Sequence, residues 1–116
     1  MPTKRRPWKF SDIQLVHTAL SALYPNIFDL ENPVPLKVGI RRDIRAQFPA
    51  MNSTVMSHFL GYITTRPKYL DKCVEGAPRY DLDGQCGFVT AEEAAYAVKR
   101  RAQQLRKQQR ELGRAA

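Results

Sequence analysis

Side chains that suit a phosphate-bearing ligand are concentrated in one stretch, residues 64–88. Thr64 and Thr65 are typical helix caps, and Arg66 and Lys68 follow them directly. A helix start offers free backbone N–H groups and the positive end of the helix dipole, so two cations there would strengthen an anion site. We therefore predict that a short helix begins at Thr65 and faces phosphate with its first turn.

An aromatic side chain and another arginine lie further along this stretch. Tyr69 could stack on a base or hydrogen-bond a ribose hydroxyl, and such stacking contributes about 1 to 3 kcal/mol per base. Arg79 carries a planar fork of donors that matches a phosphate group. The plainer alternatives are a half-buried core tyrosine and a solvent-facing arginine paired with Asp81 or Asp83.

Carboxylates occur in pairs, but an enzymatic role for them is a poor hypothesis. Asp81 and Asp83 belong to a turn signal, and Glu92 and Glu93 belong to a helix-capping signal. No nucleophile or phosphate-binding glycine loop accompanies them, and His58 lies in a helical pattern beside an apolar residue. We predict no catalytic residue and no cofactor.

The cysteines and histidines do not have the spacing of a metal site. Cys73 and Cys86 are too far apart for the usual short ligand pair, and His17 and His58 are further away still. We predict free thiols and no metal.

The cations of this 116-residue chain, whose formal net charge is +8, are concentrated at its two ends. Residues 1–10 carry four cations and no acid, and residues 99–116 carry seven cations and Glu111, which leaves −2 for the segment between them. We expect a basic arm over residues 1–10, one domain over residues 11–98 and a basic helical extension over residues 99–116. Such charge suits a polyanionic partner.

Three features that the sequence lacks indicate the cellular compartment. No apolar run approaches the roughly 18 residues of a membrane span, and the N-terminus lacks the apolar core of a signal peptide. Two cysteines also make no disulfide framework. We expect a cytoplasmic protein with no membrane partner.

Apolar spacing predicts four helices in the first two thirds of the chain. They cover residues 11–23, about 36–47, about 53–63, with Asn52 or Ser53 as the cap of this third helix, and a short segment from Thr65. In the second helix Leu36, Ile40 and Ile44 would face inward. Its outer face would then present four cations, Lys37, Arg41, Arg42 and Arg45.

After Gly76 the apolar pattern changes to a period of two residues. Residues 79–82 and 86–89 flank Asp83-Gly84, which is a strong hairpin signal. Thr90 and Glu93 then form a capping box that begins a last helix. Its apolar spacing fades beyond Lys99, so we expect the helix to fray towards the C-terminus.

Three motifs resemble the ProQ/FinO family of bacterial RNA-binding proteins and RNA chaperones. They are PLKVGI at residues 35–40, RPKYL at residues 66–70, and GAPRYDLDGQ at residues 76–85 before the Thr90 capping box. They occur in the order and at the spacing of that family, across about the central two thirds of the chain.

The resemblance implies a compact, mostly helical α+β domain with a small β-hairpin and a concave face that grips the 3′ end of an RNA. The implied ligand is a terminator-like stem-loop with a single-stranded, uridine-rich tail. By the same resemblance a pocket between helix and hairpin would receive the terminal nucleotide, and Lys37 would match the lysine of the PLK motif, Tyr69 the pocket tyrosine and Arg79 the hairpin arginine. The segment with Thr65, Arg66 and Lys68 would face phosphates at the foot of the stem.

One predicted surface departs from the pattern of the family. Some relatives carry basic residues along the helix before Thr64, whereas this chain has Ser53, Ser57 and Gly61 at about those places. We expect Arg41, Arg42 and Arg45 of the preceding helix to compensate.

Our main hypothesis is a monomeric RNA-binding protein, an RNA chaperone that recognises structured small RNAs or mRNA 3′ ends for post-transcriptional regulation. An alternative is a basic helical DNA-binding regulator that uses residues 36–63 as a helix-turn-helix, although residues 53–64 offer few base-reading side chains. A third is a protein-interaction module whose charge only aids solubility.

Overall fold

A computed structural model describes residues 9–115 of the chain. Within this range, five α-helices and one β-hairpin form a mostly helical α+β fold, which confirms the predicted fold class. The first eight residues of the predicted basic arm lie outside the described residues. The elements in chain order are α1 (Phe10–Leu23), α2 (Ile40–Gln47), α3 (Ser53–Thr64), α4 (Pro67–Lys72), β1 (Pro78–Asp81), β2 (Gly84–Phe88) and α5 (Ala91–Ala115).

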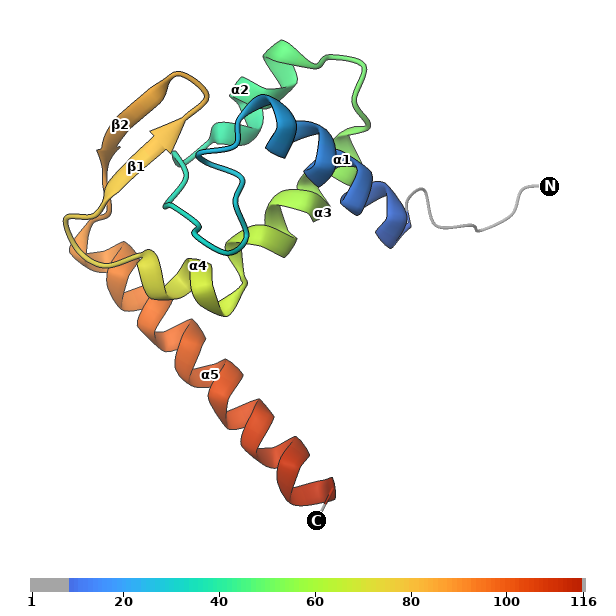
Figure 1. The fold of residues 1–116 in the computed structure, drawn as a ribbon. Helices are drawn as coiled ribbons and strands as arrows, with labels where there is room; N and C mark the ends of the chain where they lie inside the picture. Colours follow the sequence, from blue (N-terminus) through green and yellow to red (C-terminus); the bar gives the residue numbers. More distant parts are fainter. Residues whose placement is uncertain (1–8, 116) are drawn as a thin grey trace.

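Helix α3 lies at the centre of the fold and packs against α1, α2 and α4 (Figure 1). Helix α4 in turn packs against the first half of α5, and the hairpin lies beside the segment that leads into α2. The second half of α5 projects from the body with no other helix or strand alongside it in Figure 1.

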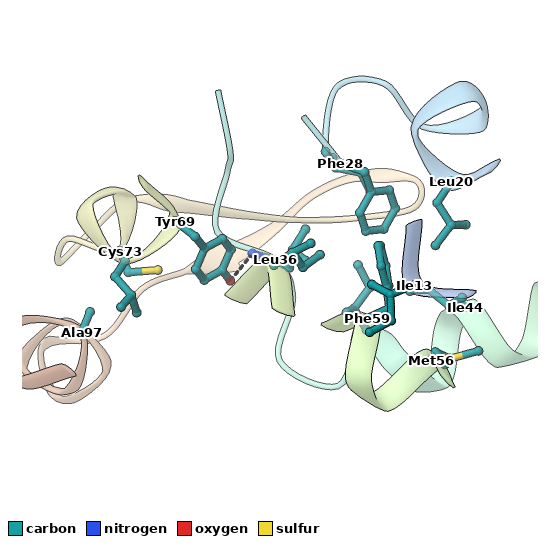
Figure 2. Packing of buried hydrophobic residues seen from close by; sticks show 14 residues of the cluster. Ile13, Leu20, Phe28, Leu36, Ile44, Met56, Phe59, Tyr69, Cys73 and Ala97 are labelled. Atoms are coloured by element: carbon teal, nitrogen blue, oxygen red, sulfur yellow. Dashed lines mark hydrogen bonds between the residues drawn. The ribbon is translucent and has the colours of Figure 1, made fainter. Parts of the chain in front are cut away.

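One hydrophobic core joins the helices to the segment between α1 and α2. Phe28 and Phe59 pack at its centre with ring centroids 5.8 Å apart and ring planes tilted by 51°, and Leu20, Ile44 and Met56 are fully enclosed around them (Figure 2). Leu36, Ile40 and Ile44 all lie inside, as predicted. The core continues through Tyr69, Leu70 and Cys73 of the α4 segment to Ala97 of α5.

Local signals in the sequence correctly predicted two helix starts and the existence of the hairpin. The Asn52 side chain accepts the Thr54 and Val55 backbone N–H groups at 2.8 and 3.0 Å and begins α3. Thr90 and Glu93 form the predicted capping box, with bonds of 2.9 and 3.2 Å. The hairpin turns one residue earlier than predicted, at Leu82 and Asp83, because Asp81 pairs with Gly84; Gly84, whose φ of 137° a side chain would disfavour, begins β2.

The predicted start of the second helix is wrong, because α2 begins at Ile40 and not near Leu36. Gly39 has a φ of 88°, so the helix cannot extend back through it. The preceding segment is extended and pairs with β1 instead. Lys37 donates its N–H to the Tyr80 carbonyl at 2.8 Å, and Tyr80 donates to the Pro35 carbonyl at 2.9 Å. Lys37 therefore lies beside the hairpin and not on a helix face.

The prediction that Thr64 and Thr65 cap the fourth helix is also wrong. Both hydroxyls donate backwards to α3 carbonyls, Thr64 to Leu60 and Thr65 to Gly61, each at 2.7 Å. Arg66 occupies the cap position of α4 and contributes no side-chain capping bond. The threonines end α3, and α4 starts at Pro67.

Helix α5 extends without a break from Ala91 to Ala115, across the boundary that we predicted near residue 98. It therefore continues further than its apolar spacing indicates, past exposed Leu105 and Leu112.

Candidate nucleic-acid interface

A hollow of about 350 Å³ lies where α4, β1 and α5 meet. We call it the α4–α5 hollow. It brings together two segments that are distant in sequence, and it includes three of the predicted site residues, Thr65, Tyr69 and Arg79. Its lining consists of Thr64, Thr65, Tyr69, Leu70, Arg79, Glu92, Glu93, Tyr96 and Arg100.

Tyr69 forms part of the wall of this hollow and is mostly buried in the core. Its hydroxyl accepts the backbone N–H of Leu36 at 3.0 Å (Figure 2), and only 8% of the residue is exposed. Burial raises the pKa of this phenol, so the hydroxyl keeps its proton at neutral pH. Tyr69 is thus packed as a core residue, which was the plainer alternative. The small exposed part of its side chain lines the hollow.

Arg79 joins three elements at the floor of the hollow. One terminal nitrogen donates to the Leu36 carbonyl at 2.5 Å, and the other lies 3.1 Å from Glu93 at the start of α5. The side chain is 12% exposed, and its Nε has no hydrogen-bond partner among the described residues. The predicted alternative of a solvent-facing strand arginine is therefore wrong.

Glu93 has two donors that favour its charged form. The backbone N–H of Thr90 lowers the pKa of this carboxyl most, and the Arg79 guanidinium lowers it further. Glu93 therefore stays ionised and holds Arg79 in place while it caps α5.

Sequence reasoning missed two residues of the hollow, Tyr96 and Arg100. Tyr96 is 64% exposed, which makes it the more open aromatic surface of the two tyrosines. The two residues are four positions apart on α5, so they share a face of that helix. That spacing was visible in the sequence, but nothing local indicated that α5 would lie beside Tyr69 and Arg79.

Arg66 lies on the other side of Tyr69, away from the α4–α5 hollow. Its guanidinium donates to the Tyr62 hydroxyl at 2.7 Å and stands over the Tyr62 ring at 5.1 Å from the centroid. Its Nε is buried without a hydrogen-bond partner among the described residues. Arg66 thus packs α3 against the start of α4.

Two of the predicted arginines gather over the first half of α3. Arg41 donates through Nε to the Ser57 hydroxyl at 2.9 Å and through a terminal nitrogen to Ser53, and Arg45 reaches Ser53 at 3.3 Å. These serines occupy places where the resemblance leads one to expect cations. We call Arg41 and Arg45, with their serine partners, the α2–α3 arginine cluster.

The remaining predicted residues lie outside both groups. The Lys37 ammonium is 2.8 Å from Asp43, whose carboxylate raises the lysine pKa. Lys68 pairs with Glu31 on the surface. Arg42 is exposed on α2.

Two further observations bear on the chemistry available. Between residues 9 and 115, no three His, Cys, Asp or Glu side chains are placed to share a metal ion. In the same range no helix has both the length and the apolar character to cross a bilayer.

Comparison with known proteins places most of the chain in one family. Residues 10–114 match the ProQ/FINO family. Three curated relatives, each named RNA chaperone ProQ, are similar over most of this chain. That of Alteromonas mediterranea is 32% identical over 77% of the chain, that of Pseudoalteromonas atlantica 35% over 68%, and that of Haemophilus influenzae 31% over 82%.

Solved structures share the fold. A crystal structure of a FinO-like RNA chaperone from Neisseria meningitidis superimposes with a TM-score of 0.64 at 28% identity, covering 77% of this chain and 93% of that one. A solution structure of a ProQ homologue from Legionella pneumophila gives a TM-score of 0.68 at 23% identity, covering 89% and 90%.

The matched region accounts for 42%, 38% and 51% of the lengths of the three curated relatives. The chain thus corresponds to about half or less of those proteins. Since the family match covers nearly all of the described residues, the chain belongs to the ProQ/FinO family.

Proposed function

We propose that this protein binds structured RNA and that the α4–α5 hollow receives the 3′-terminal nucleoside. The observation that carries the proposal is the meeting of Tyr69 and Arg79 with exposed Tyr96 around one hollow of about 350 Å³. An aromatic surface beside arginine suits an unpaired base and its sugar, because stacking accepts any base and cations hold the backbone.

The charges of the hollow favour a terminal hydroxyl over a terminal phosphate. Two arginines, Arg79 and Arg100, are balanced there by Glu92 and Glu93. Carboxylates accept hydrogen bonds from ribose hydroxyls, whereas a phosphate monoester would bring roughly two further negative charges beside them. A 3′-hydroxyl end therefore fits, and a 3′-phosphorylated end is repelled.

The α2–α3 arginine cluster supplies a second contact, to the phosphates of the stem. Its serines lie at the start of α3, and the α4–α5 hollow lies at the other end. Eleven residues of helix separate these ends, which corresponds to about 16 Å. A single-stranded tail would span this interval, with the duplex on the arginines and the terminus in the hollow. The arginines would read the duplex through its backbone.

We place this activity in the cytoplasm, as a monomer that matches, protects or represses small RNAs and mRNA 3′ ends. One chain supplies the whole hollow, so no partner subunit is needed to complete it. The relatives' name, RNA chaperone, supports this role over the DNA-binding alternative. The proposal involves no covalent chemistry, cofactor or metal.

Equilibrium binding at fixed, near-physiological salt tests the proposal. The RNAs are a terminator hairpin with a uridine-rich tail and a 3′-hydroxyl, the same RNA with a 3′-phosphate, and the same RNA without its tail. We expect the two altered RNAs to bind about tenfold more weakly or worse, about 1.4 kcal/mol. Equal affinity for all three would refute the assignment of the hollow.

A further inference from the structure

The cations of α5 are arranged on one side of the helix. One series on this side has steps of three and four positions, the spacing of a single helix face: Tyr96, Arg100, Gln103, Lys107, Arg110 and Arg114. Lys99 and Arg106 directly precede two of these residues and lie at the edge of the same face. We call its cations the α5 stripe. They are Lys99, Arg100, Arg106, Lys107, Arg110 and Arg114.

None of these six cations has a hydrogen bond or ion pair with another side chain among residues 9–115, whereas Arg101 of the same helix does. Arg101 lies on the side that faces α4 and pairs with Asp71 at 3.1 Å. Near it, Gln104 donates to the Thr65 carbonyl at 2.7 Å. The contacts that fix α5 to the body therefore leave the stripe free for a ligand.

The stripe begins at the α4–α5 hollow. Tyr96 and Arg100 line the hollow, and Lys107 and Arg114 follow Arg100 at intervals of seven residues, two helical turns. From Arg100 to Arg114 the helix rises about 21 Å. A second segment of the bound RNA that passes beside the hollow could thus follow the cations along the projecting half of α5, where no other helix or strand lies in Figure 1.

We infer that the α5 stripe is a second track for the RNA backbone, continuous with the hollow, and not merely a source of diffuse positive charge. This inference rests on the proposed function and extends it from the 3′ tail, which runs from the hollow to the α2–α3 arginine cluster, to a second segment of the same RNA. The complementary partner is a polyanion with closely spaced charges. A second copy of the chain does not suit the stripe, because six cations would face six others.

A charge-relocation variant tests the inference without changing composition. It combines Arg106→Gln and Arg110→Gln, which remove two stripe cations, with Gln108→Arg and Gln109→Arg. Positions 108 and 109 are exposed and lie one and two residues from Lys107, so they belong to other sides of α5. Glutamine and arginine are similarly good helix formers, and circular dichroism should show unchanged helix content.

We expect the relocated protein to bind the 3′-hydroxyl hairpin about five- to tenfold more weakly, with the salt slope reduced by about 1.4, since each single-strand phosphate contact contributes about 0.7. Its preference for a 3′-hydroxyl over a 3′-phosphate should stay at the wild-type ratio. Affinity within twofold of wild type, with an unchanged salt slope, would overturn the inference that the α5 stripe binds the RNA backbone. Loss of the 3′-end preference in wild type would instead refute the proposed function, so the two failures are distinguishable.

Discussion

The hydroxyl of Tyr69 accepts the backbone N–H of Leu36 at 3.0 Å, across 33 positions of sequence. Because α4 carries Tyr69 and the extended segment before α2 carries Leu36, this one bond fixes a wall of the α4–α5 hollow against the hairpin side of the fold.

Removing that hydroxyl should destabilise the protein measurably. Tyr69→Phe keeps the ring but leaves the buried Leu36 N–H without its acceptor, which costs about 1 to 3 kcal/mol of unfolding free energy. Urea denaturation measures the change. Tyr96→Phe is the matched control, since Tyr96 is 64% exposed, and a comparable loss in that variant would contradict the role given to the Leu36 bond.

Replacing Arg79 by lysine should affect both stability and 3′-end recognition. The planar guanidinium reaches the Leu36 carbonyl and Glu93 at once, whereas an ammonium cannot reproduce that fork. We expect Arg79→Lys to lose about 1 to 3 kcal/mol of stability and most of the preference for a 3′-hydroxyl. Arg42→Lys, at an exposed position of α2, serves as the control. If Arg79→Lys kept wild-type stability and the wild-type preference for a 3′-hydroxyl, the guanidinium contacts of Arg79 would not be required for either property.

The pH dependence of stability should report the contact between Glu93 and its donors. The folded-state pKa of Glu93 lies below its ordinary value of 4.5, so the stability that it contributes is present above that value and is lost as pH falls through the folded-state pKa. Glu93→Gln cannot titrate. Wild type should therefore exceed the variant in unfolding free energy at pH 7, and the gap should shrink below about pH 4.5. A gap that stays constant from pH 7 to pH 3 would contradict this.

A cation placed on the exposed side of α3 should strengthen RNA binding. Gly61 is exposed, and a Cβ added there meets no heavy atom within 4 Å. Gly61→Arg should raise stability by about 0.7 kcal/mol through helix propensity and also raise affinity for the hairpin RNA at low salt. Gly61→Gln separates the two effects, because it should give a similar stability gain with no gain in affinity. Equal affinities for both variants would place the stem elsewhere.

Local sequence signals predicted the fold well, and long-range contacts explain where they failed. The Asn52 cap, the Thr90 capping box and the hairpin, which turns one residue earlier than predicted, each depend on residues within a few positions, so sequence reasoning found them. The start of α2 depends on pairing between residues 35–37 and Tyr80, more than 40 positions away. An isolated helical pattern at Leu36 carries no trace of that pairing.

The candidate site was predicted in part, for the same reason. Tyr69 and Arg79 were identified through a resemblance, and the structure brings them into one hollow. Tyr96 and Arg100 complete it only because α5 packs against α4, which no local pattern indicated. Arg41 lies over Ser57, a contact that depends on the relative placement of α2 and α3, and the compensating role of this arginine stays a prediction.

Crosslinking from the RNA terminus would test the central claim most directly. A hairpin RNA with 4-thiouridine as its 3′-terminal nucleotide is bound to the wild-type protein and irradiated, and the crosslinked peptides are mapped by mass spectrometry. We predict crosslinks within residues 64–70 and 92–100, the two segments that meet at the α4–α5 hollow, and their loss with a 3′-phosphate. Crosslinks confined to α1 or α2 would show that the RNA terminus lies outside the hollow.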